Sequence, residues 1–261
     1  MSDFPKKVVI ISGAARGIGK AIALQFAKKG WYLALLDLDI GTLTETALEI
    51  PSEQRCYVQC DITKDEEVLN AIQYMTNKTN GRVDLLVNNA GLIEVGDFDQ
   101  LSLEVQQKLI DVNFTGLIRL TYHTLPALKN TPRSRIINMS SASALIGNPE
   151  LSVYAATKAA VKSLTEGWSI AFKKYDIKVS DLLPLFVRTN MVYGYYDKYR
   201  HMTEKTARLS PEQVARVVWK ASKSNRIHWY VGAKTKLFAF LLGILPMKVQ
   251  IPIYKSVIKY K

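Results

Sequence analysis

The sequence contains few cysteines and few histidines. Its only cysteines are Cys56 and Cys60, and four residues of extended chain would separate their α-carbons by roughly 13 Å, too far for a disulfide. No histidine lies near them in the sequence, so a metal site is also unsupported. The histidines, His123, His201 and His228, are widely separated. None forms a nucleophile triad with a nearby serine and aspartate, and we expect them to be surface or packing residues.

The chain also lacks a long apolar run. Near the amino terminus Ser12, Gly13 and Arg16 interrupt the first apolar stretch before it resembles a signal peptide or a membrane span. We therefore expect a cytoplasmic protein. With 261 residues, of which 48% are hydrophobic and 22% charged, the chain suits one large globular domain.

Acidic residues are absent from the carboxyl end. No Asp or Glu follows Glu212, while the residues after it supply ten of the net twelve positive charges. A basic protein invites a nucleic-acid interpretation, but this excess is confined to one end and is interleaved with aliphatic residues. We expect no nucleic-acid partner.

Short apolar runs without alternation recur along the chain and are separated by helical patterns. The runs are KKVVIIS, WYLALLDLD, CYVQCDI, VDLLVNNAG, SRIINMSS, IKVSDLLPLFV and HWYVG. Such runs are typical of strands buried on both faces of a parallel sheet. The repeated β–α units predict an α/β fold, a Rossmann-like doubly wound parallel sheet flanked by helices on both faces. We expect residues 1–233 to form a single domain, and residues 234–261 a basic, apolar C-terminal extension.

Three glycines follow the first run and precede a helical pattern: Gly13, Gly17 and Gly19. Glycines at these positions permit a tight turn and a close approach of the backbone to a ligand, and the amino terminus of the helix presents N–H groups to a phosphate. The strand before the turn and the helix after it favour a phosphate-binding site over an ordinary glycine-rich turn.

The second run ends on Asp37, eighteen residues beyond Gly19. A carboxylate at this place accepts hydrogen bonds from an adenosine ribose and repels a 2′-phosphate, which favours NAD(H). Arg16 argues for NADP(H), because its guanidinium could pair with the extra phosphate. Asp39 competes with Asp37 for the ribose, and Asp37 could instead cap the following helix.

Further polar residues fall at the ends of strands. Asp61, after the third run, is placed to accept a hydrogen bond from an adenine amino group. The amides of Asn88 and Asn89 could satisfy neighbouring strand ends as readily as contact a ligand. Ligands of doubly wound sheets bind at the carboxyl ends of the strands. One shared crevice is therefore expected to contain Gly13, Asp37, Asp61, Asn88, Ser141 and Pro184.

Tyr154 and Lys158 lie four residues apart in a stretch with good helix propensity, so they would share one helical face. A neighbouring cation favours the phenolate and lowers the tyrosine pKa from roughly 10 toward neutrality. Ser141 could donate a hydrogen bond to the oxygen on which charge develops. A solvated lysine beside a half-buried tyrosine is the alternative interpretation. Asn113 interrupts a long helical pattern, where it could disturb the helix and bind a water.

The motifs S-G-A-A-R-G-I-G at 12–19, N-N-A-G at 88–91, Asn113, Ser141 and Y-A-A-T-K at 154–158 occur in this order. Together they resemble the short-chain dehydrogenases/reductases over about residues 6 to 232. The resemblance implies that Tyr154 is the general acid/base and that Lys158 lowers its pKa and binds the nicotinamide ribose. It also implies that Ser141 positions the carbonyl or hydroxyl group and Asn113 holds a water, while Ser140 is structural.

The resemblance further implies that residues 1–233 are a dinucleotide-binding and catalytic domain with a set of cofactor contacts. They are Gly13, Arg16, Gly17, Ile18, Gly19, Asp37, Asp61, Ile62, Asn89, Ala90, Gly91, Tyr154, Lys158, Pro184, Val187 and Thr189. The family commonly has Pro-Gly after the sixth strand, whereas this chain has Pro184 followed by Leu185 and Phe186. We therefore expect a bulkier wall over the nicotinamide.

The implied reaction is hydride transfer between a nicotinamide cofactor and a small-molecule secondary alcohol or ketone. A lipophilic substrate is favoured by an aromatic and thioether-rich segment at 188–209. Its side chains are Met191, Tyr193, Tyr195, Tyr196, Tyr199 and Met202. The alternatives are an NADPH-dependent 3-oxoacyl-thioester reductase and a non-catalytic nucleotide-sensing protein. Family likeness implies a homodimer or homotetramer.

Residues 234–261 combine apolar bulk with lysines and tyrosines. The apolar part, Leu237 to Leu245, is too short to span a bilayer and is followed by Pro246. Its composition suits an interfacial anchor that makes peripheral contact with the inner face of a membrane. A dimerisation arm and a lid packed on the core are the alternatives.

Overall fold

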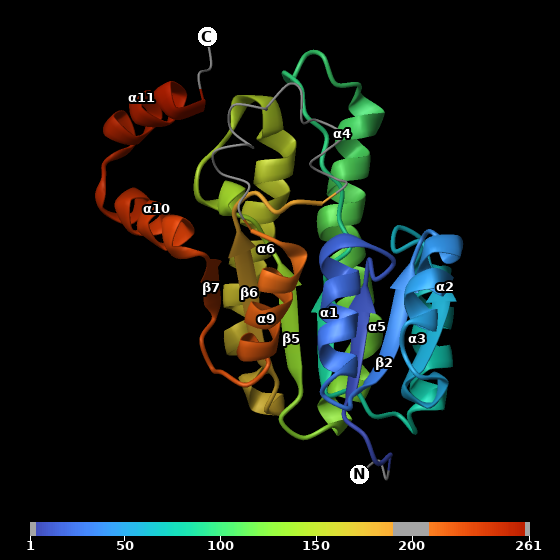
Figure 1. Cartoon of the computed structure of the whole chain (residues 1–261). Coiled ribbons are helices and arrows are strands. Elements are labelled where there is room, and N and C mark those ends of the chain that lie inside the picture. The colour runs from blue at the N-terminus through green and yellow to red at the C-terminus, as the bar shows by residue number, and fades with distance from the viewer. Residues whose placement is uncertain (1–3, 190–208, 259–261) are drawn as a thin grey trace.

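The computed structural model describes residues 4–189 and 209–258. Within these residues the centre of the protein is a seven-stranded parallel sheet with the order β3-β2-β1-β4-β5-β6-β7 (Figure 1). The strands are β1 (Val8–Ser12), β2 (Tyr32–Asp37), β3 (Arg55–Gln59), β4 (Leu85–Asn88), β5 (Arg135–Met139), β6 (Lys178–Pro184) and β7 (His228–Val231). The predicted doubly wound sheet is confirmed.

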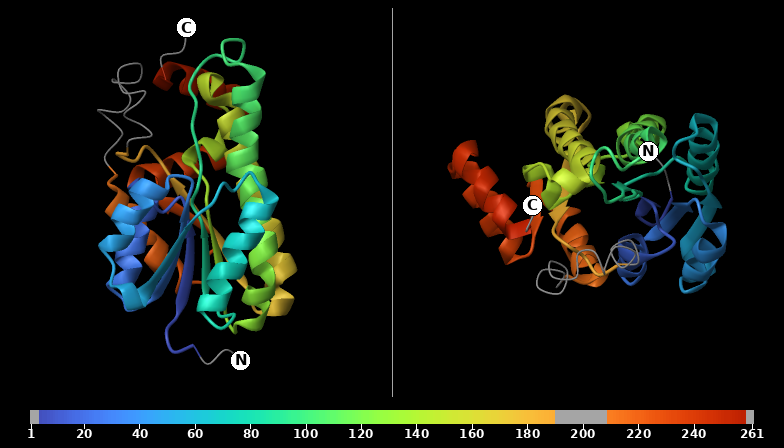
Figure 2. Two further views of the ribbon diagram at one scale, coloured as in Figure 1. Left: turned by 90° about the vertical axis from the view of Figure 1, so that its right-hand side faces the viewer. Right: turned by 90° about the horizontal axis from the view of Figure 1, so that it is seen from above.

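Helices cover both faces of this sheet (Figure 2). One face carries α1 (Gly17–Ala27), α2 (Ile40–Leu48) and α9 (Pro211–Ala221). The other face carries α3 (Asp65–Lys78), α5 (Gly116–Asn130) and α6 (Ser152–Ala171). The helix α4 (Leu103–Ile110) continues the line of α5 beyond the carboxyl edge of the sheet (Figure 1).

The central strands bury alternate residues in two separate cores. In β1, Val9 and Ile11 pack with Phe26 of α1 on one face of the sheet. Val8 and Ile10 belong to the core on the opposite face. All four β1 side chains are at most 1% exposed. Burial on both faces explains why the apolar runs show no alternation in the sequence.

The sheet changes direction at β1, which pairs with β2 on one side and with β4 on the other. Ile10 is in register with Ala34 of β2 and with Leu86 of β4. The loops that follow β1 and β4 therefore leave the sheet in opposite directions and open a crevice at the carboxyl edge. This is where the predicted site residues lie.

The long helical pattern around Asn113 is broken, as expected. A π-helical turn, Asp111–Thr115, separates α4 from α5. The N–H of Gly116 donates to the carbonyl of Asp111, five residues back. Such turns are frequent at functional sites because they reposition side chains and backbone carbonyls.

The chain after β7 forms two helices, α10 (Ala233–Ile244) and α11 (Met247–Ile258). They are separated at Leu245, which has extended backbone angles and precedes Pro246. The helix α10 follows the end of the edge strand β7, and both helices lie outside the layers that cover the sheet (Figures 1 and 2). The division of the chain at residue 233 stays a prediction.

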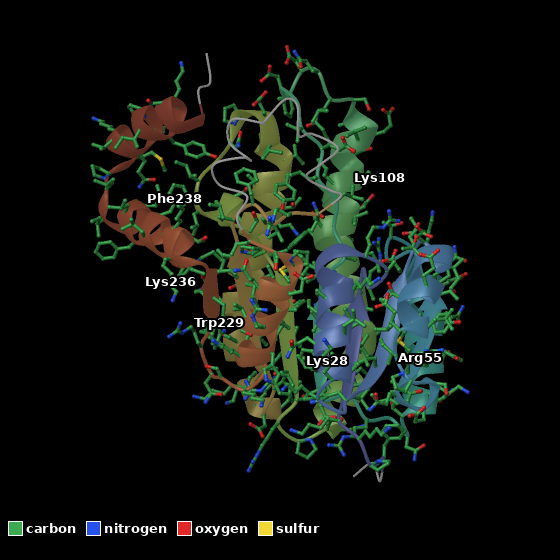
Figure 3. The ribbon with its side chains drawn as sticks, viewed as in Figure 1. Lys28, Arg55, Lys108, Trp229, Lys236 and Phe238 are labelled. Atoms are coloured by element: carbon green, nitrogen blue, oxygen red, sulfur yellow. The ribbon has the colours of Figure 1, made fainter. Side chains whose placement is uncertain are left out.

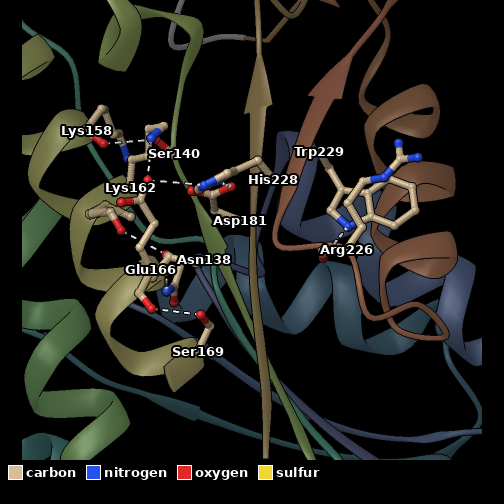
Figure 4. A network of polar contacts seen from close by, with 12 residues as sticks. Asn138, Ser140, Lys158, Lys162, Glu166, Ser169, Asp181, Arg226, His228 and Trp229 are labelled. Atoms are coloured by element: carbon tan, nitrogen blue, oxygen red, sulfur yellow. Dashed lines mark hydrogen bonds and ion pairs between the residues drawn. The ribbon is translucent and has the colours of Figure 1, made fainter. Parts of the chain in front are cut away.

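A polar network joins β7 to β6 and α6 (Figure 4). The ring nitrogens of His228 lie 2.9 Å from Asp181 Oδ1 and 3.2 Å from Glu166 Oε1. Lys162 contacts the same Glu166 carboxylate. His228 is therefore half-buried and packs β7 against β6 and α6 through these contacts. His123 contacts Asp65 across 2.9 Å, and His201 lies outside the described residues.

Two helical glycines allow the turn after β1 to be tested through stability. A Cβ added at Gly19 would lie 1.9 Å from the Gly13 carbonyl oxygen, whereas one added at Gly167 in α6 would meet nothing within 4 Å. We expect Gly19→Ala to lower the free energy of unfolding by about 1–3 kcal/mol or more. Gly167→Ala, the matched control, should raise it by about 0.5–1 kcal/mol. Urea denaturation measures both, and a Gly19→Ala protein as stable as the parent would contradict the close approach.

Candidate active site

A cleft of about 1160 Å³ runs along the carboxyl edge of the sheet. All predicted site residues within the described part of the chain except Gly19, Asn88 and Asn113 line it. The lining residues among them are Gly13, Arg16, Gly17, Ile18, Asp37, Asp61, Ile62, Asn89, Ala90, Gly91, Ser141, Tyr154, Lys158, Pro184, Val187 and Thr189. One cavity thus contains the glycine turn, the acidic strand ends and the Ser–Tyr–Lys group.

The turn after β1 requires glycine at two positions. Gly13 and Gly17 have φ angles of +63° and +56°, in the left-handed region that glycine adopts without steric cost. A Cβ on Gly13 would also lie 2.8 Å from the Ala90 α-carbon. Within the described part of the chain, no side chain caps the first turn of α1. Its amino-terminal N–H groups are therefore suited to an anionic ligand.

Ser12 and Asn89 fix this turn against β4. The Ser12 hydroxyl donates to the Val87 carbonyl across 3.4 Å and accepts from the N–H groups of Asn89 and Ala90. The Asn89 amide donates to the carbonyls of Ser12 and Gly13, both at 3.0 Å. Asn89 therefore supports the turn with its side chain. Ser12 is the first residue of the glycine motif in the sequence, and its hydroxyl fixes the motif to β4.

The two carboxylates after β2 have different partners. Asp37 Oδ2 accepts from the Ala15 N–H at 2.9 Å, and Oδ1 accepts from the Asp39 N–H at 3.1 Å. Asp39 caps α2 by accepting from the N–H and hydroxyl of Thr42, and it pairs with Arg16. The Thr42 N–H is the main cause that lowers the pKa of Asp39. The alternative in which Asp37 caps the helix is therefore wrong, since Asp39 does so.

The ammonium of Lys158 lies inside the protein. This residue is 5% exposed, and its Nζ lies 3.0 Å from the Met139 carbonyl, to which it donates, and 5.6 Å from the centroid of the Tyr154 ring. Burial lowers the pKa of Lys158 to about 8. An ammonium has three N–H donors, so two beyond the Met139 bond can bind ligand hydroxyl groups.

The expected lowering of the tyrosine pKa is not present in the structure. Burial raises the pKa of Tyr154, and a hydrogen bond with Ser141 acts in the opposite direction. The physical reason is that desolvation disfavours the phenolate, while the Lys158 ammonium is itself desolvated and donates to Met139. At neutral pH the phenol is therefore protonated and can act as an acid.

Neighbouring serines have separate roles. Ser141 Oγ accepts from the Ser143 N–H at 3.1 Å and faces the cleft. The hydroxyl of Ser140 donates to the main-chain carbonyl of Lys158 at 2.9 Å. Ser140 therefore joins the end of β5 to α6, in agreement with its expected structural role.

Two asparagines lie behind the cleft. The Asn113 amide pairs with the Leu92 backbone, accepting from its N–H at 2.8 Å and donating to its carbonyl at 2.9 Å. The expected binding of a water by Asn113 stays a prediction. Asn88 donates to Thr121 and Asn138 inside the core. Its expected place in the crevice is wrong.

Other lining residues were missed by the sequence analysis. A polar stripe on α4 and the π-helical turn faces the cleft, formed by Glu104, Gln107, Lys108 and Asp111. Their i, i+3, i+4, i+7 spacing is a signal that could have identified one helical face. Leu185 and Phe186 also line the cleft, so a bulky wall replaces the usual glycine. Met191, Tyr193, Tyr195, Tyr196, Tyr199 and Met202, the expected substrate wall, lie outside the described residues.

Comparison with known proteins identifies the family. Residues 7–200 match the family model described as short chain dehydrogenase. The chain is 30% identical to epidermal retinol dehydrogenase 2 of Mus musculus, over 94% of this chain and 80% of that protein.

Two solved structures of 25% identity or more are also similar. The 3-ketoacyl-(acyl-carrier-protein) reductase from Brucella melitensis, complexed with NADH, is 28% identical with a TM-score of 0.79 and covers 86% of this chain and 96% of its own. ElxO with NADP bound is 26% identical with a TM-score of 0.78, over 87% of this chain and 97% of its own. The chain therefore belongs to the short-chain dehydrogenase/reductase family of oxidoreductases.

Proposed function

We propose that this oxidoreductase interconverts a lipophilic ketone and its secondary alcohol with a nicotinamide cofactor, preferably NAD(H). The observation that carries the proposal is the single cleft that contains Ser141, Tyr154, Lys158, the glycine turn and Asp37. The cofactor-bound structures of similar proteins, with NADH and NADP, support a nicotinamide dinucleotide in this cleft. When bound, the nicotinamide supplies or accepts the hydride at the carbinol carbon.

The residues of the cleft fit such a cofactor from one end to the other. Gly13 and the uncapped start of α1 suit the pyrophosphate, because the backbone can approach it closely. Asp37 lies at the edge that would contact the adenosine ribose. The remaining donors of Lys158 suit the hydroxyl groups of the nicotinamide ribose. Val187 and Thr189 line the same cleft and would contact the carboxamide.

In the reductive direction the substrate oxygen receives a proton from the Tyr154 phenol. Ser141 would donate a hydrogen bond to the same oxygen while negative charge develops on it. The phenolate left on Tyr154 is stabilised by the nearby Lys158 ammonium. Oxidation of the alcohol runs the same proton transfer in reverse and needs the phenolate first. Burial raises the pKa of Tyr154, so the protonated form that reduction uses is the one present at neutral pH in this structure.

A second groove supports a lipophilic substrate. It has a volume of about 610 Å³ and lies between α11 and the start of α6. Ser143 lines both the groove and the main cleft. The apolar side chains of the groove are Ala144, Leu145, Ile146, Pro149, Ala155, Ala156, Ala159, Met247 and Ile251. An apolar substrate that extends beyond Ser143 would find a matching surface there, and contact of the C-terminal helices with lipid is part of this proposal.

A second candidate function is reduction of a 3-oxoacyl thioester. The similarity to the Brucella melitensis reductase favours it, as does the excess of lysines after Glu212. A panel of steroid, retinoid and long-chain ketones and acyl thioesters, assayed by nicotinamide absorbance with both cofactors, separates the two. Activity confined to acyl thioesters with NADPH would replace the first proposal. Oligomerisation as a dimer or tetramer stays a prediction.

Removal of the Tyr154 hydroxyl tests the proton transfer. We expect Tyr154→Phe to lower kcat about 10²–10⁴-fold, the usual contribution of a positioned acid or base. Affinity for the cofactor, measured by calorimetry, should change little. Tyr122→Phe is the matched control, because Tyr122 is 71% exposed and does not line the cleft. A Tyr154→Phe enzyme that retains most of its turnover would refute the assigned role.

The pH profile of reduction tests the buried lysine. The phenol stays protonated across the neutral range because burial raises the pKa of Tyr154. The ammonium is lost above about pH 8, because burial lowers the pKa of Lys158 to about 8. We expect kcat/KM for reduction to be level below this pH and to fall about tenfold per pH unit above it. Lys162→Gln on the same helix should leave the profile unchanged, and a level profile in the parent up to about pH 9.5 would contradict the assignment.

The Arg16–Asp39 pair offers a test of cofactor preference. Asp39→Asn keeps a good helix cap but removes the charge that pairs with Arg16. The guanidinium can then pair with a 2′-phosphate, so the NADP-to-NAD ratio of kcat/KM should rise about tenfold. Adding Arg16→Ala to the same protein should cancel the gain. An Asp39→Asn ratio equal to that of the parent would show that Arg16 does not reach this phosphate.

A further inference from the structure

The C-terminal helices present apolar side chains to solvent. On α10, Leu237, Phe240, Leu241 and Ile244 are 59%, 64%, 40% and 61% exposed. Their i, i+3, i+4, i+7 spacing places them on one side of the helix. On α11, Val249 and Ile253 lie four residues apart and are 40% and 51% exposed. We propose that these six side chains, the docking face, insert into the surface of a membrane that contains anionic phospholipid.

The charges around the docking face fit such a membrane. Lys234, Lys236, Lys248 and Lys255 are all exposed, and no Asp or Glu follows Glu212 in the sequence. Lys234 precedes Leu237 by three residues, so it lies on the same side of α10 as the apolar side chains, at the amino-terminal end of the helix. Apolar side chains with flanking lysines and no acidic residues bind anionic lipid by burial and by charge together.

Contacts on the inner side of the two helices keep the docking face directed outward. The Thr235 hydroxyl donates to the Val231 carbonyl at 2.8 Å and is buried. Phe238 lies in the angle between α10 and α11 (Figure 3), where its ring centroid is 6.4 Å from that of Tyr254. The Gln250 amide donates to the carbonyls of Leu242 and Leu245 at 2.9 and 2.6 Å. The bend between the helices is therefore fixed by side chains that are not on the docking face.

A membrane fits the docking face better than a second copy of the chain. A twofold interface brings a surface against itself. Here it would bring lysines against lysines, with no carboxylate after Glu212 to pair with them. A lid packed on the core is also disfavoured, since the six side chains of the docking face are exposed.

The length of α10 suits a helix that lies on the surface of a membrane and does not cross it. The twelve residues of α10 measure about 18 Å, against a hydrocarbon core of roughly 30 Å. Within residues 4–189 and 209–258, no helix is long and apolar enough to cross a bilayer. The inference extends the lipid contact in the proposed function, but it requires no turnover.

Co-sedimentation with vesicles tests the inference on the full-length protein. The vesicles contain phosphatidylcholine alone or phosphatidylcholine with phosphatidylserine. We expect binding to the anionic vesicles, at least tenfold weaker binding to the neutral ones, and weakening by salt. Phe240→Ser with Ile244→Ser should reduce binding to anionic vesicles more than tenfold. Leu48→Ser with Ile170→Ser is the matched control, since these side chains are 68% and 77% exposed on α2 and α6.

Equal pelleting of the parent and the Phe240→Ser, Ile244→Ser protein would overturn the inference. The inference would also be overturned if the parent protein did not pellet with vesicles. A parent dimer that binds no vesicles and that the same substitutions dissociate would overturn it too, because the docking face would then join two copies of the chain. Tyr154→Phe should bind vesicles as the parent does. The two proposals can fail independently. If the parent protein binds vesicles but reduces no carbonyl compound, the membrane contact of the docking face is supported and the proposed function is refuted.

Discussion

The pairing of β1 with β4 is the constraint on which the cleft depends. It places the turn after β1 beside the turn after β4, and the Ser12 hydroxyl joins the two through Val87, Asn89 and Ala90. Gly13 then lies so close to Ala90 that no side chain fits between them. The backbone at the start of α1 is exposed to the cleft for this reason. A dinucleotide would bind mainly to main-chain groups there, so the strand order is itself part of the binding site.

The catalytic side of the cleft depends on buried charge. Lys158 is almost completely buried and its pKa falls to about 8, while burial moves the pKa of Tyr154 the other way. Both shifts favour the neutral forms of the two groups, because desolvation penalises charge. Donation to the Met139 carbonyl offsets part of the cost for Lys158. The Tyr154 phenol is therefore protonated at neutral pH in this structure, and under the proposed mechanism the phenolate would form as the proton is transferred to substrate.

Local patterns in the sequence were enough to predict the sheet, the glycine turn and the meeting of Tyr154 with Lys158. Each depends on residues that are close in sequence or on strand ends that a parallel sheet must bring together. The pKa of Tyr154 could not be predicted this way, because it depends on burial by distant parts of the chain. The same holds for Asp37 and Asp39, whose roles as acceptor and cap follow from the backbone angles of one turn. The polar stripe of α4 faces the cleft only because that helix extends beyond the sheet (Figure 1).

The polar network around His228 connects the active site to the C-terminal helices. Lys158 and Glu166 lie on the same helix, two turns apart, and Glu166 contacts His228 at the start of β7. His228 also contacts the buried Asp181, whose second oxygen has no hydrogen-bond partner among the described residues. Breaking this contact would leave a buried carboxylate without compensation, which is strongly destabilising. Because β7 continues through Gly232 directly into α10, the network fixes the position of that helix relative to the one that carries Tyr154. Under the proposed membrane contact, this network would hold the docking face at one position relative to the cleft.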